Sequence, residues 1–341
     1  MPGLLLDTLN GKRADKVPLW LMRQAGRYLP EYRELRAEKG GFLAMAYDSE
    51  AACEITLQPI DRFGFDGAIL FSDILIVPHA MGQHLEFLAG EGPKLSPPLV
   101  DAALEGLAAD HSRYEPIYQT VRLCRQRLPE GVTMLGFAGS PWTVATYMVA
   151  GEGSRDQHDA RALAYRDPGK LQAIIDAIVG ETVEYLSGQI EAGAEAVQLF
   201  DSWAGSLAPD EFERWVIAPN AAIVAALAQR HPDTPVIGFP KGSGEKLPAY
   251  ARETGVKAVG VDETLDPLWV ARELPAGMAV QGNLDPLLLL SGSPALEGRI
   301  KAILEAFSDR PHVFNLGHGI DRRTPIENVE RLIATVRGWQ G

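Results

Sequence analysis

Short apolar runs alternate along this chain with longer segments whose apolar positions recur at helical spacing. A turn rich in Gly, Asp or Ser separates each run from the helical pattern that follows, and about eight such units occur at irregular intervals. Because most runs are nearly uninterrupted, they are typical of parallel strands buried on both faces. The pattern predicts strands at residues 17–22, 67–71, 133–137, 196–200, 235–239, 258–261, 279–281 and 313–316.

Helices are predicted between these strands, and several begin near a proline, which suits the first turn of a helix. The clearest are residues 48–63, 114–128, 168–192, 209–230 and 324–339, and the helix-starting prolines are Pro30, Pro168, Pro209 and Pro325. The repeated order predicts an α/β fold, a (β/α)8 TIM barrel whose active-site cleft lies at the C-terminal ends of the strands. No linker divides the chain, so residues 1–341 are expected to form a single domain. Residues 77–98, rich in Pro and Gly, are expected to leave the barrel as an excursion over its mouth.

Composition narrows the range of partners. The chain has 341 residues, 46% of them hydrophobic, and a formal net charge of −13. An acidic chain argues against nucleic acid or an anionic membrane as a partner, since both attract clustered Lys and Arg. No stretch approaches the roughly 18 apolar residues of a membrane helix, and residues 1–10 lack a secretory leader. A soluble, cytoplasmic protein is the expectation.

The sequence shows no metal-binding or nucleotide-binding signature. Cys53 and Cys124 both lie in amphipathic helical patterns, and the seven histidines are scattered. These spacings predict neither a disulfide nor a zinc site. A phosphate-binding P-loop, a dinucleotide fingerprint and a nucleophile elbow are also lacking, so no cofactor or metal is expected.

The loop after the first predicted strand carries two arginines, Arg23 and Arg27, on either side of Gly26. Arginine offers a planar fork of donors that fits a carboxylate or phosphate, and glycine lets the backbone approach a ligand closely. The loop is therefore a candidate anion site. The alternative is that both arginines are ordinary solvated surface charges.

Polar side chains also follow the other predicted strands: Ser72, Asp73, Tyr147, Ser202, Lys241, Asp262, Glu263, Asn283 and His318. Each has a simpler interpretation, since Asp73 could cap a helix, Tyr147 could belong to the core and His318 could be a turn residue. In a parallel barrel, however, the carboxyl ends of all strands meet at one face. The set therefore predicts one polar site at that face.

Five motifs together resemble the uroporphyrinogen decarboxylase family. They are RQAGRYLPEYR at 23–33, ILFSDIL at 69–75, GFAGSPWT at 136–143, FDSWAG at 200–205 and NLGHG at 315–319. The resemblance runs from about residue 18 to about residue 330. It implies a (β/α)8 barrel, usually a homodimer, that needs no metal or organic cofactor. Such an enzyme removes CO2 from the four acetate side chains of uroporphyrinogen III, giving coproporphyrinogen III for heme and chlorophyll synthesis.

The resemblance also implies roles for individual residues. Arg23, Gln24, Ala25, Gly26 and Arg27 would line the substrate cleft, with Asp73 at its centre, Tyr147, Ser202 and His318 at its rim, and Phe137 and Phe200 as apolar walls. Two places depart from the family pattern. Trp203 stands where some relatives have His, and the turn of residues 320–325 leaves open whether Arg322 and Arg323 touch substrate or solvent.

The implied substrate carries eight carboxylates around a flexible ring of pyrroles whose N–H groups can point inward. An ionised Asp73 only accepts hydrogen bonds, so it suits those donors and a cationic intermediate. Arg23, Arg27, Tyr147, His318 and a bound water all remain candidates for delivering the proton. Two other functions remain open: a zinc-dependent methyltransferase acting on a corrinoid or thiol, and a non-catalytic tetrapyrrole carrier.

Overall fold

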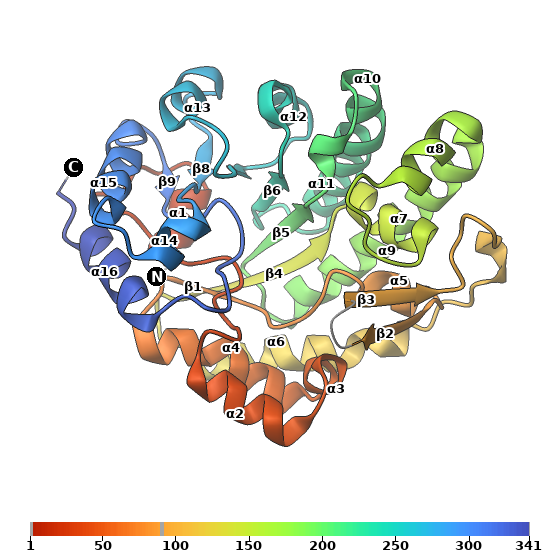
Figure 1. The fold of residues 1–341 in the computed structure, drawn as a ribbon, viewed down its shortest axis with the longest axis horizontal. Helices are drawn as coiled ribbons and strands as arrows, with labels where there is room; N and C mark the ends of the chain where they lie inside the picture. The colour runs from red at the N-terminus through yellow and green to blue at the C-terminus, as the bar shows by residue number, and fades with distance from the viewer. Residues whose placement is uncertain (1–2, 89–91, 341) are drawn as a thin grey trace.

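The computed structural model describes residues 3–88 and 92–340, and its centre is a curled parallel sheet surrounded by helices (Figure 1). Seven strands pair in the order β1-β4-β5-β6-β7-β8-β9. They are β1 (Gly67–Ile69), β4 (Thr133–Gly139), β5 (Ala196–Asp201), β6 (Val236–Pro240), β7 (Ala258–Gly260), β8 (Ala279–Gln281) and β9 (His312–Val313). All seven overlap predicted runs, six of them to within two residues at each end, whereas β9 ends three residues earlier than predicted. The architecture is the predicted α/β barrel.

The eighth predicted strand, residues 17–22, is reduced to a single parallel bridge between Leu19 and Phe314. On its other side, the Asp66 amide donates to the Leu19 carbonyl at 2.9 Å, which joins this segment to the chain just before β1. Two features stop a regular ladder here. Pro18 has no N–H to donate, and the Leu19 amide donates to the Asp66 carboxylate at 2.7 Å instead of to a main-chain carbonyl. The segment still occupies the position between β9 and β1.

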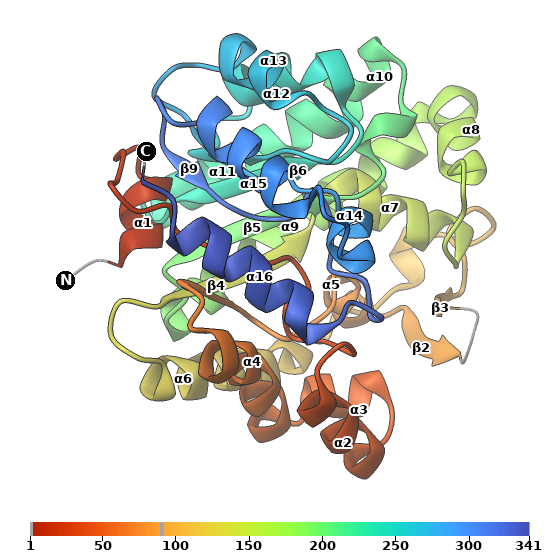
Figure 2. The ribbon, with the colours of Figure 1, turned by 60° about the vertical axis from the view of Figure 1, so that its left-hand side comes forward.

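Sixteen α-helices are present among the described residues, and they lie outside the sheet in both views (Figures 1 and 2). They are α1 (Leu4–Leu9), α2 (Pro30–Lys39), α3 (Phe42–Tyr47), α4 (Ser49–Phe63), α5 (Ile76–Ala80), α6 (Glu115–Arg127), α7 (Pro141–Ala150), α8 (His158–Arg166), α9 (Pro168–Ala192), α10 (Pro209–Phe212), α11 (Ala218–Arg230), α12 (Leu247–Glu253), α13 (Pro267–Glu273), α14 (Pro286–Ser291), α15 (Leu296–Ala306) and α16 (Ile326–Arg337). Short 3₁₀ turns occur at Leu104–Gly106, His111–Tyr114, Ala204–Ser206 and Gly244–Lys246. No helix in this part of the chain is long and apolar enough to cross a membrane.

Most predicted helices are confirmed, including 168–192 with both of its ends. The predicted helix 209–230 is instead interrupted by a π-helical turn, Glu213–Ile217, between α10 and α11. Pro30, Pro168 and Pro209 open their helices, whereas Pro325 is the residue before α16.

The excursion predicted at residues 77–98 contains α5 and an antiparallel hairpin, β2 (His84–Leu88) and β3 (Gly92–Ser96). Residues 89–91 at its tip lie outside the described residues. The hairpin lies at one side of the molecule, next to α7 (Figure 1). The Leu95 amide donates to the carbonyl of Gly151 at 2.7 Å, which fixes the hairpin to the end of that helix.

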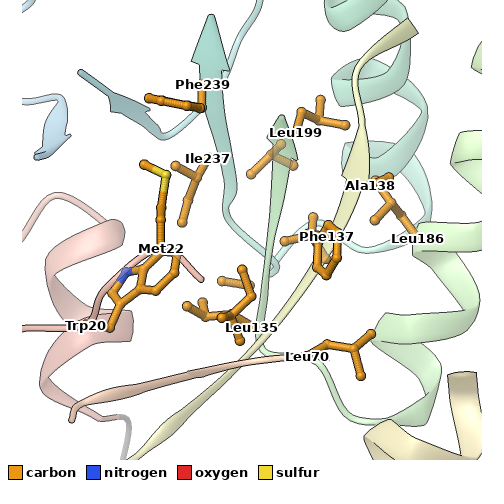
Figure 3. Packing of buried hydrophobic residues seen from close by; sticks show 14 of the residues in the cluster. Trp20, Met22, Leu70, Leu135, Phe137, Ala138, Leu186, Leu199, Ile237 and Phe239 are labelled. Atoms are coloured by element: carbon orange, nitrogen blue, oxygen red, sulfur yellow. The ribbon is translucent and has the colours of Figure 1, made fainter. Parts of the chain in front are cut away.

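The hydrophobic core fills the inside of the sheet and the space under the helices. Figure 3 shows Trp20 and Met22 of the first loop among side chains from β4, β5 and β6, such as Leu135 and Ile237. The Trp20 indole donates to Gln281 Oε1 at 3.0 Å, so this one buried polar edge has a partner. This packing anchors the loop that follows Met22 at the mouth of the barrel, meaning the carboxyl end of its strands.

Candidate active site

The loop of residues 22–29 is held at the barrel mouth by two buried amide side chains. The side chain of Gln24 accepts from the Leu21 amide at 3.0 Å and donates to the Gly67 carbonyl at 2.8 Å. From the opposite side, Asn315 Oδ1 accepts from the Met22 amide at 2.9 Å. The Gln24 side chain is therefore used to shape the loop, and so is its main-chain amide, which donates to the Leu21 carbonyl at 2.9 Å.

Arg23 is the residue of this loop that faces the other predicted site residues. The backbone φ of Arg23 is 61°, in the left-handed region, which is uncommon for residues other than glycine. Its aliphatic stem lies against Gly319, where an added Cβ would come within 2.3 Å of Arg23 Cδ. The Arg23 charge acts on Asp73, Tyr147 and His318. Three residues from other strand-end segments therefore lie within the electrostatic reach of the Arg23 guanidinium.

Asp73 lies four residues beyond β1 and is half-buried. Its Oδ1 accepts from the Leu75 amide at 2.8 Å, a local turn contact rather than the helix cap considered from sequence. Burial raises the pKa of Asp73 to about 6, against the opposing effects of the Leu75 amide and the Arg23 charge. No hydrogen bond to Oδ2 occurs among the described residues. That oxygen is available to a ligand that donates.

Tyr147 lies on α7 and is half-buried. Burial raises the pKa of its phenol, and the nearby Asp73 carboxyl adds to that rise, while a hydrogen bond with Trp203 and the charge of Arg23 oppose it. The hydroxyl therefore keeps its proton at neutral pH and can donate a hydrogen bond.

Ser202 follows β5 directly, and a buried hydrogen-bond hub fixes its position. The Thr143 hydroxyl of α7 donates to Asp201 Oδ1 at 2.6 Å and accepts from the Trp203 amide at 3.1 Å. Burial raises the pKa of Asp201 to about 7, with the Thr143 bond acting in the other direction. Ser202 is thus held between two residues that both bind Thr143.

His318 is a neutral imidazole at pH 7. The Gly319 amide donates to His318 Nδ1 at 2.6 Å, so Nδ1 is the unprotonated nitrogen and Nε2 carries the hydrogen. Burial, together with the charges of Arg23 and Lys241, lowers the pKa of His318 to about 3. The ring also packs edge-on against Phe239, at 6.2 Å between centroids. His318 is therefore able to donate a hydrogen bond through Nε2 but is not a cation.

An aromatic wall crosses the ends of β4, β5 and β6. Phe137 meets Phe200 at 5.5 Å, and Phe200 meets Phe239 at 6.0 Å, both with nearly perpendicular rings. Phe137 and Phe200 had been expected in this role. Phe239 had not, although its place at the end of a predicted strand was a usable signal.

Arg27, the second arginine of this loop, lines a basic pocket together with Arg33, Arg36, Arg322 and Arg323. The loop of residues 22–29 therefore contributes one arginine whose charge acts on Asp73 and a second arginine that lines this basic pocket.

Two other polar residues after strands have structural contacts. The Asp262 carboxylate accepts from the Gly242 amide at 2.7 Å, and the Asn283 amide donates to the Asp262 carbonyl at 2.9 Å. Both side chains fix neighbouring loops. Lys241, by contrast, is half-buried and places its charge near His318, a role that the sequence did not reveal.

Within residues 3–88 and 92–340, no group of three or more His, Cys, Asp or Glu side chains is arranged to hold a metal ion. Cys53 and Cys124 are free and buried in α4 and α6, the helical positions predicted for them.

A carboxylate, an arginine, a tyrosine and a neutral histidine grouped at the strand ends of an α/β barrel define a barrel enzyme with a site for an anionic ligand. Residues 2–339 match the family model described as uroporphyrinogen decarboxylase (URO-D). The uroporphyrinogen decarboxylase of Novosphingobium aromaticivorans is 74% identical over 339 residues, 99% of each chain. That of Erythrobacter litoralis is 73% identical over 340 residues, 100% of each. The chain belongs to the uroporphyrinogen decarboxylase family, and its enzyme class is that of the carboxy-lyases.

Solved structures with low sequence identity share the fold. A methyltransferase from Methanosarcina mazei has a TM-score of 0.82 at 21% identity and covers 97% of this chain and 96% of its own. A B12-independent methionine synthase from Shewanella sp. W3-18-1 has a TM-score of 0.59 at 10% identity, covering 96% and 95%. At such identities the likeness concerns the barrel alone. The full-length relatives above therefore favour the decarboxylase over the methyltransferase considered from sequence.

Proposed function

We propose that this protein converts uroporphyrinogen III to coproporphyrinogen III and four CO2 at the barrel mouth, using its own side chains and no cofactor. The observation that carries the proposal is the half-buried carboxylate of Asp73, whose Oδ2 has no partner among the described residues and which lies within the field of Arg23. The family's substrate offers pyrrole N–H donors at its centre and carboxylates at its edge. Such a ligand matches an acceptor surrounded by donors.

Binding follows from the donor and acceptor types present. Asp73 accepts from the pyrrole N–H groups, and Arg23 pairs with a carboxylate. The hydroxyls of Tyr147 and Ser202 and the Nε2–H of His318 donate to further carboxylate oxygens. The loop of Gln24, Ala25 and Gly26 lines the same edge, with the amides of Ala25 and Gly26 as further donors. The aromatic wall of Phe137, Phe200 and Phe239 covers the apolar parts of the macrocycle.

The chemical step needs a place for the electrons that CO2 leaves behind. Protonation of the pyrrole carbon next to the acetate makes the ring a cationic electron sink for the loss of CO2. The methylene carbon left behind then takes up a proton to become a methyl group, and the ring carbon releases its added proton, so that each acetate consumes one proton net. Asp73 is fixed by its bond to Leu75 before the charge develops, so it stabilises the cation more than the neutral substrate. This differential stabilisation is what lowers the barrier.

The protonation states of the mouth residues limit which group can deliver the proton to the substrate. Burial raises the pKa of the Tyr147 phenol and lowers the pKa of His318 to about 3, so neither is an effective acid at pH 7. Arginine does not release its proton in this range. These states support a water molecule oriented by an arginine of the 22–29 loop as the donor.

Anaerobic incubation of the purified protein with uroporphyrinogen III tests the proposal, with the carboxylates of the products counted by mass spectrometry. The expected product has lost four CO2 units. A non-catalytic carrier would return the substrate with all eight carboxylates, and that result would contradict the assignment. A methyltransferase would instead require stoichiometric zinc, which elemental assay of the same sample measures.

The proposal also covers the domain organisation, the cellular compartment and the oligomeric state of the protein. A single hydrophobic cluster joins residues from Leu5 to Val336, which supports one domain over residues 1–341. Two free, buried cysteines are consistent with a reducing cytoplasmic compartment. The family resemblance supports a homodimer, and light scattering of the full chain measures its mass in solution.

A further inference from the structure

A second pocket, of about 410 Å³, lies at the end of the barrel opposite to the candidate active site. Its walls come from residues 13–18, from the end of α15 with the start of β9, and from the end of α16. The helices α15 and α16 lie side by side (Figures 1 and 2). Because residues 13–18 lead into the first barrel segment and α15 leads into β9, this amino-face pocket is at the amino ends of the strands.

The charged lining of the amino-face pocket is mostly positive. It consists of four cations and one acid: Arg13, Lys16, Arg310, Arg337 and Asp15. Arg337 already pairs with the Asp66 carboxylate at 2.8 Å. Within residues 3–88 and 92–340, the side chains of Arg13 and Lys16 have neither a hydrogen bond nor an ion pair. The chain as a whole carries a net charge of −13, so this concentration of positive charge does not follow from composition.

Arg310 is the buried cation of this lining, with only 7% of the residue exposed. Its Nη2 donates to the carbonyls of Ala271 and Leu274 at 2.9 and 3.2 Å. Its Nη1 is shielded from water and has no hydrogen-bond partner in the described part of the chain. Burial lowers the pKa of the guanidinium, and no carboxylate of the described residues acts against that shift. A buried cation without a counter-charge is costly, and an anion in the pocket would reduce the cost.

The rest of the lining is largely apolar. Leu304 and Phe307 come from the end of α15, and Trp339 follows α16. His312 adds no charge, because burial lowers its pKa to about 4. Its ring packs against Phe307 at 4.8 Å between centroids. A lining that combines unpaired cations with aromatic and aliphatic side chains favours an anion with an apolar part over a bare inorganic ion.

We propose that the amino-face pocket binds a small organic phosphate, with its phosphate group near Arg13, Lys16 and Arg310 and its apolar part against Phe307 and Trp339. A phosphate monoester carries between one and two negative charges at neutral pH, so one such group can pair with several cations at once. The pocket lies at the opposite end of the barrel from Asp73. The inference therefore does not rest on the proposed function.

Calorimetric titration with phenyl phosphate tests the site in the full chain. Arg13→Ala/Lys16→Ala removes the two unpaired exposed cations, and Arg310→Gln removes the buried charge while keeping an amide donor. The control Arg166→Ala/Arg252→Ala removes two exposed arginines of α8 and α12. Affinity should fall by about tenfold in each pocket variant and stay unchanged in the control. Equal affinities in the double variant and the control would overturn the proposal, even if Arg310→Gln failed to fold.

Hydrogen exchange followed by mass spectrometry separates this pocket from the basic pocket around Arg27. Phenyl phosphate should slow exchange in residues 13–18 and 306–313 of the wild type, and the double variant should lose this protection. Protection confined to residues 22–36 would place the anion at the other pocket and overturn the proposal. Inorganic phosphate should bind more weakly than phenyl phosphate, and equal affinities would contradict an organic ligand. Both measurements omit uroporphyrinogen III, so their failure would leave the proposed function unaffected.

Discussion

At the scale of single residues, burial decides which groups of the mouth are charged. It raises the pKa of Asp73 to about 6, raises that of Tyr147 and lowers that of His318 to about 3. At pH 7 the result is one carboxylate, one neutral imidazole and one intact phenol beside the permanent charge of Arg23. The proposed catalysis by a fixed anion among neutral donors depends on this combination.

Asp73→Asn removes the anion while keeping the shape of the side chain and an oxygen for the Leu75 amide. We expect kcat to fall by at least about 100-fold, on the order of 3 kcal/mol, because the cationic intermediate loses its counter-charge. The fold and much of the carboxylate binding should persist. Circular dichroism and anaerobic turnover of the two proteins measure both effects, and wild-type-like turnover by the variant would contradict the role of Asp73.

The same residue predicts a pH dependence. Because the pKa of Asp73 is raised to about 6 in the folded protein, kcat/KM of the wild type should fall as pH drops through about 6, where the carboxylate takes up a proton. The free energy of unfolding depends on pH in the opposite direction to kcat/KM. The folded state holds this proton more tightly than the unfolded state, so stability falls as the pH rises from about 4 to about 6 and stays lower above that, by on the order of 2 kcal/mol. Asp73→Asn should therefore raise Tm at about pH 8 and lose that advantage by about pH 4.

At the scale of elements, one hydroxyl connects the end of β5 with α7. Thr143 binds both Asp201 and the Trp203 amide, and Tyr147 lies one turn further along the same helix. The relative position of Ser202 and Tyr147 therefore depends on the buried hydrogen bonds of the Thr143 hydroxyl. Asp201 and Thr143 act through their neighbours and are positioning residues.

Thr143→Val keeps the shape and removes the hydroxyl. It removes one hydrogen bond from the buried Asp201 carboxyl and the acceptor of the Trp203 amide, which should cost about 1–3 kcal/mol of stability. KM should rise, because the loop at 202–206 is less firmly fixed to α7. Thr143→Ser retains the hydroxyl and should restore KM even where some stability is lost. Chemical denaturation and steady-state kinetics of the pair provide the measurement. If Thr143→Ser fails to restore KM, the position of the 202–206 loop depends on the methyl group of Thr143 and not on its hydrogen bonds.

At the scale of the whole molecule, the barrel closes through a narrow connection. Asp66 accepts from the Leu19 amide at 2.7 Å and also pairs with Arg337 of α16 at 2.8 Å. One carboxylate thus joins the first segment of the barrel, the start of β1 and the last helix. The position of the Arg23 loop depends on that connection, because the loop follows directly from residues 17–22.

Asp66→Ala breaks the connection without touching the mouth. We expect a loss of about 2 kcal/mol of stability and a fall in Tm of about 3 °C, since an amide and a guanidinium lose a charged partner. Amide exchange should increase first at Leu19 and Phe314. Asp61→Ala, an exposed aspartate on α4, is the matched control and should leave both measurements unchanged. Equal behaviour of the two variants would show that the bridge closes without Asp66.

The sequence alone determined the order of the strands and most of the helices, because buried parallel strands need continuous apolar runs and helices need apolar positions at helical spacing. It also indicated Arg23, Asp73, Tyr147, Ser202 and His318 as candidates, since chemistry at the strand ends follows from the barrel.

Only the tertiary structure decided how these residues meet. It brought Arg27 together with Arg322 and Arg323 in one basic pocket, made Thr143 the link between Asp201 and Trp203, and let Asp66 replace a strand partner of Leu19. The physical reason is the same in each case. Periodicity reports local burial, whereas the direction and protonation of a side chain depend on groups that are distant in sequence and close only after folding.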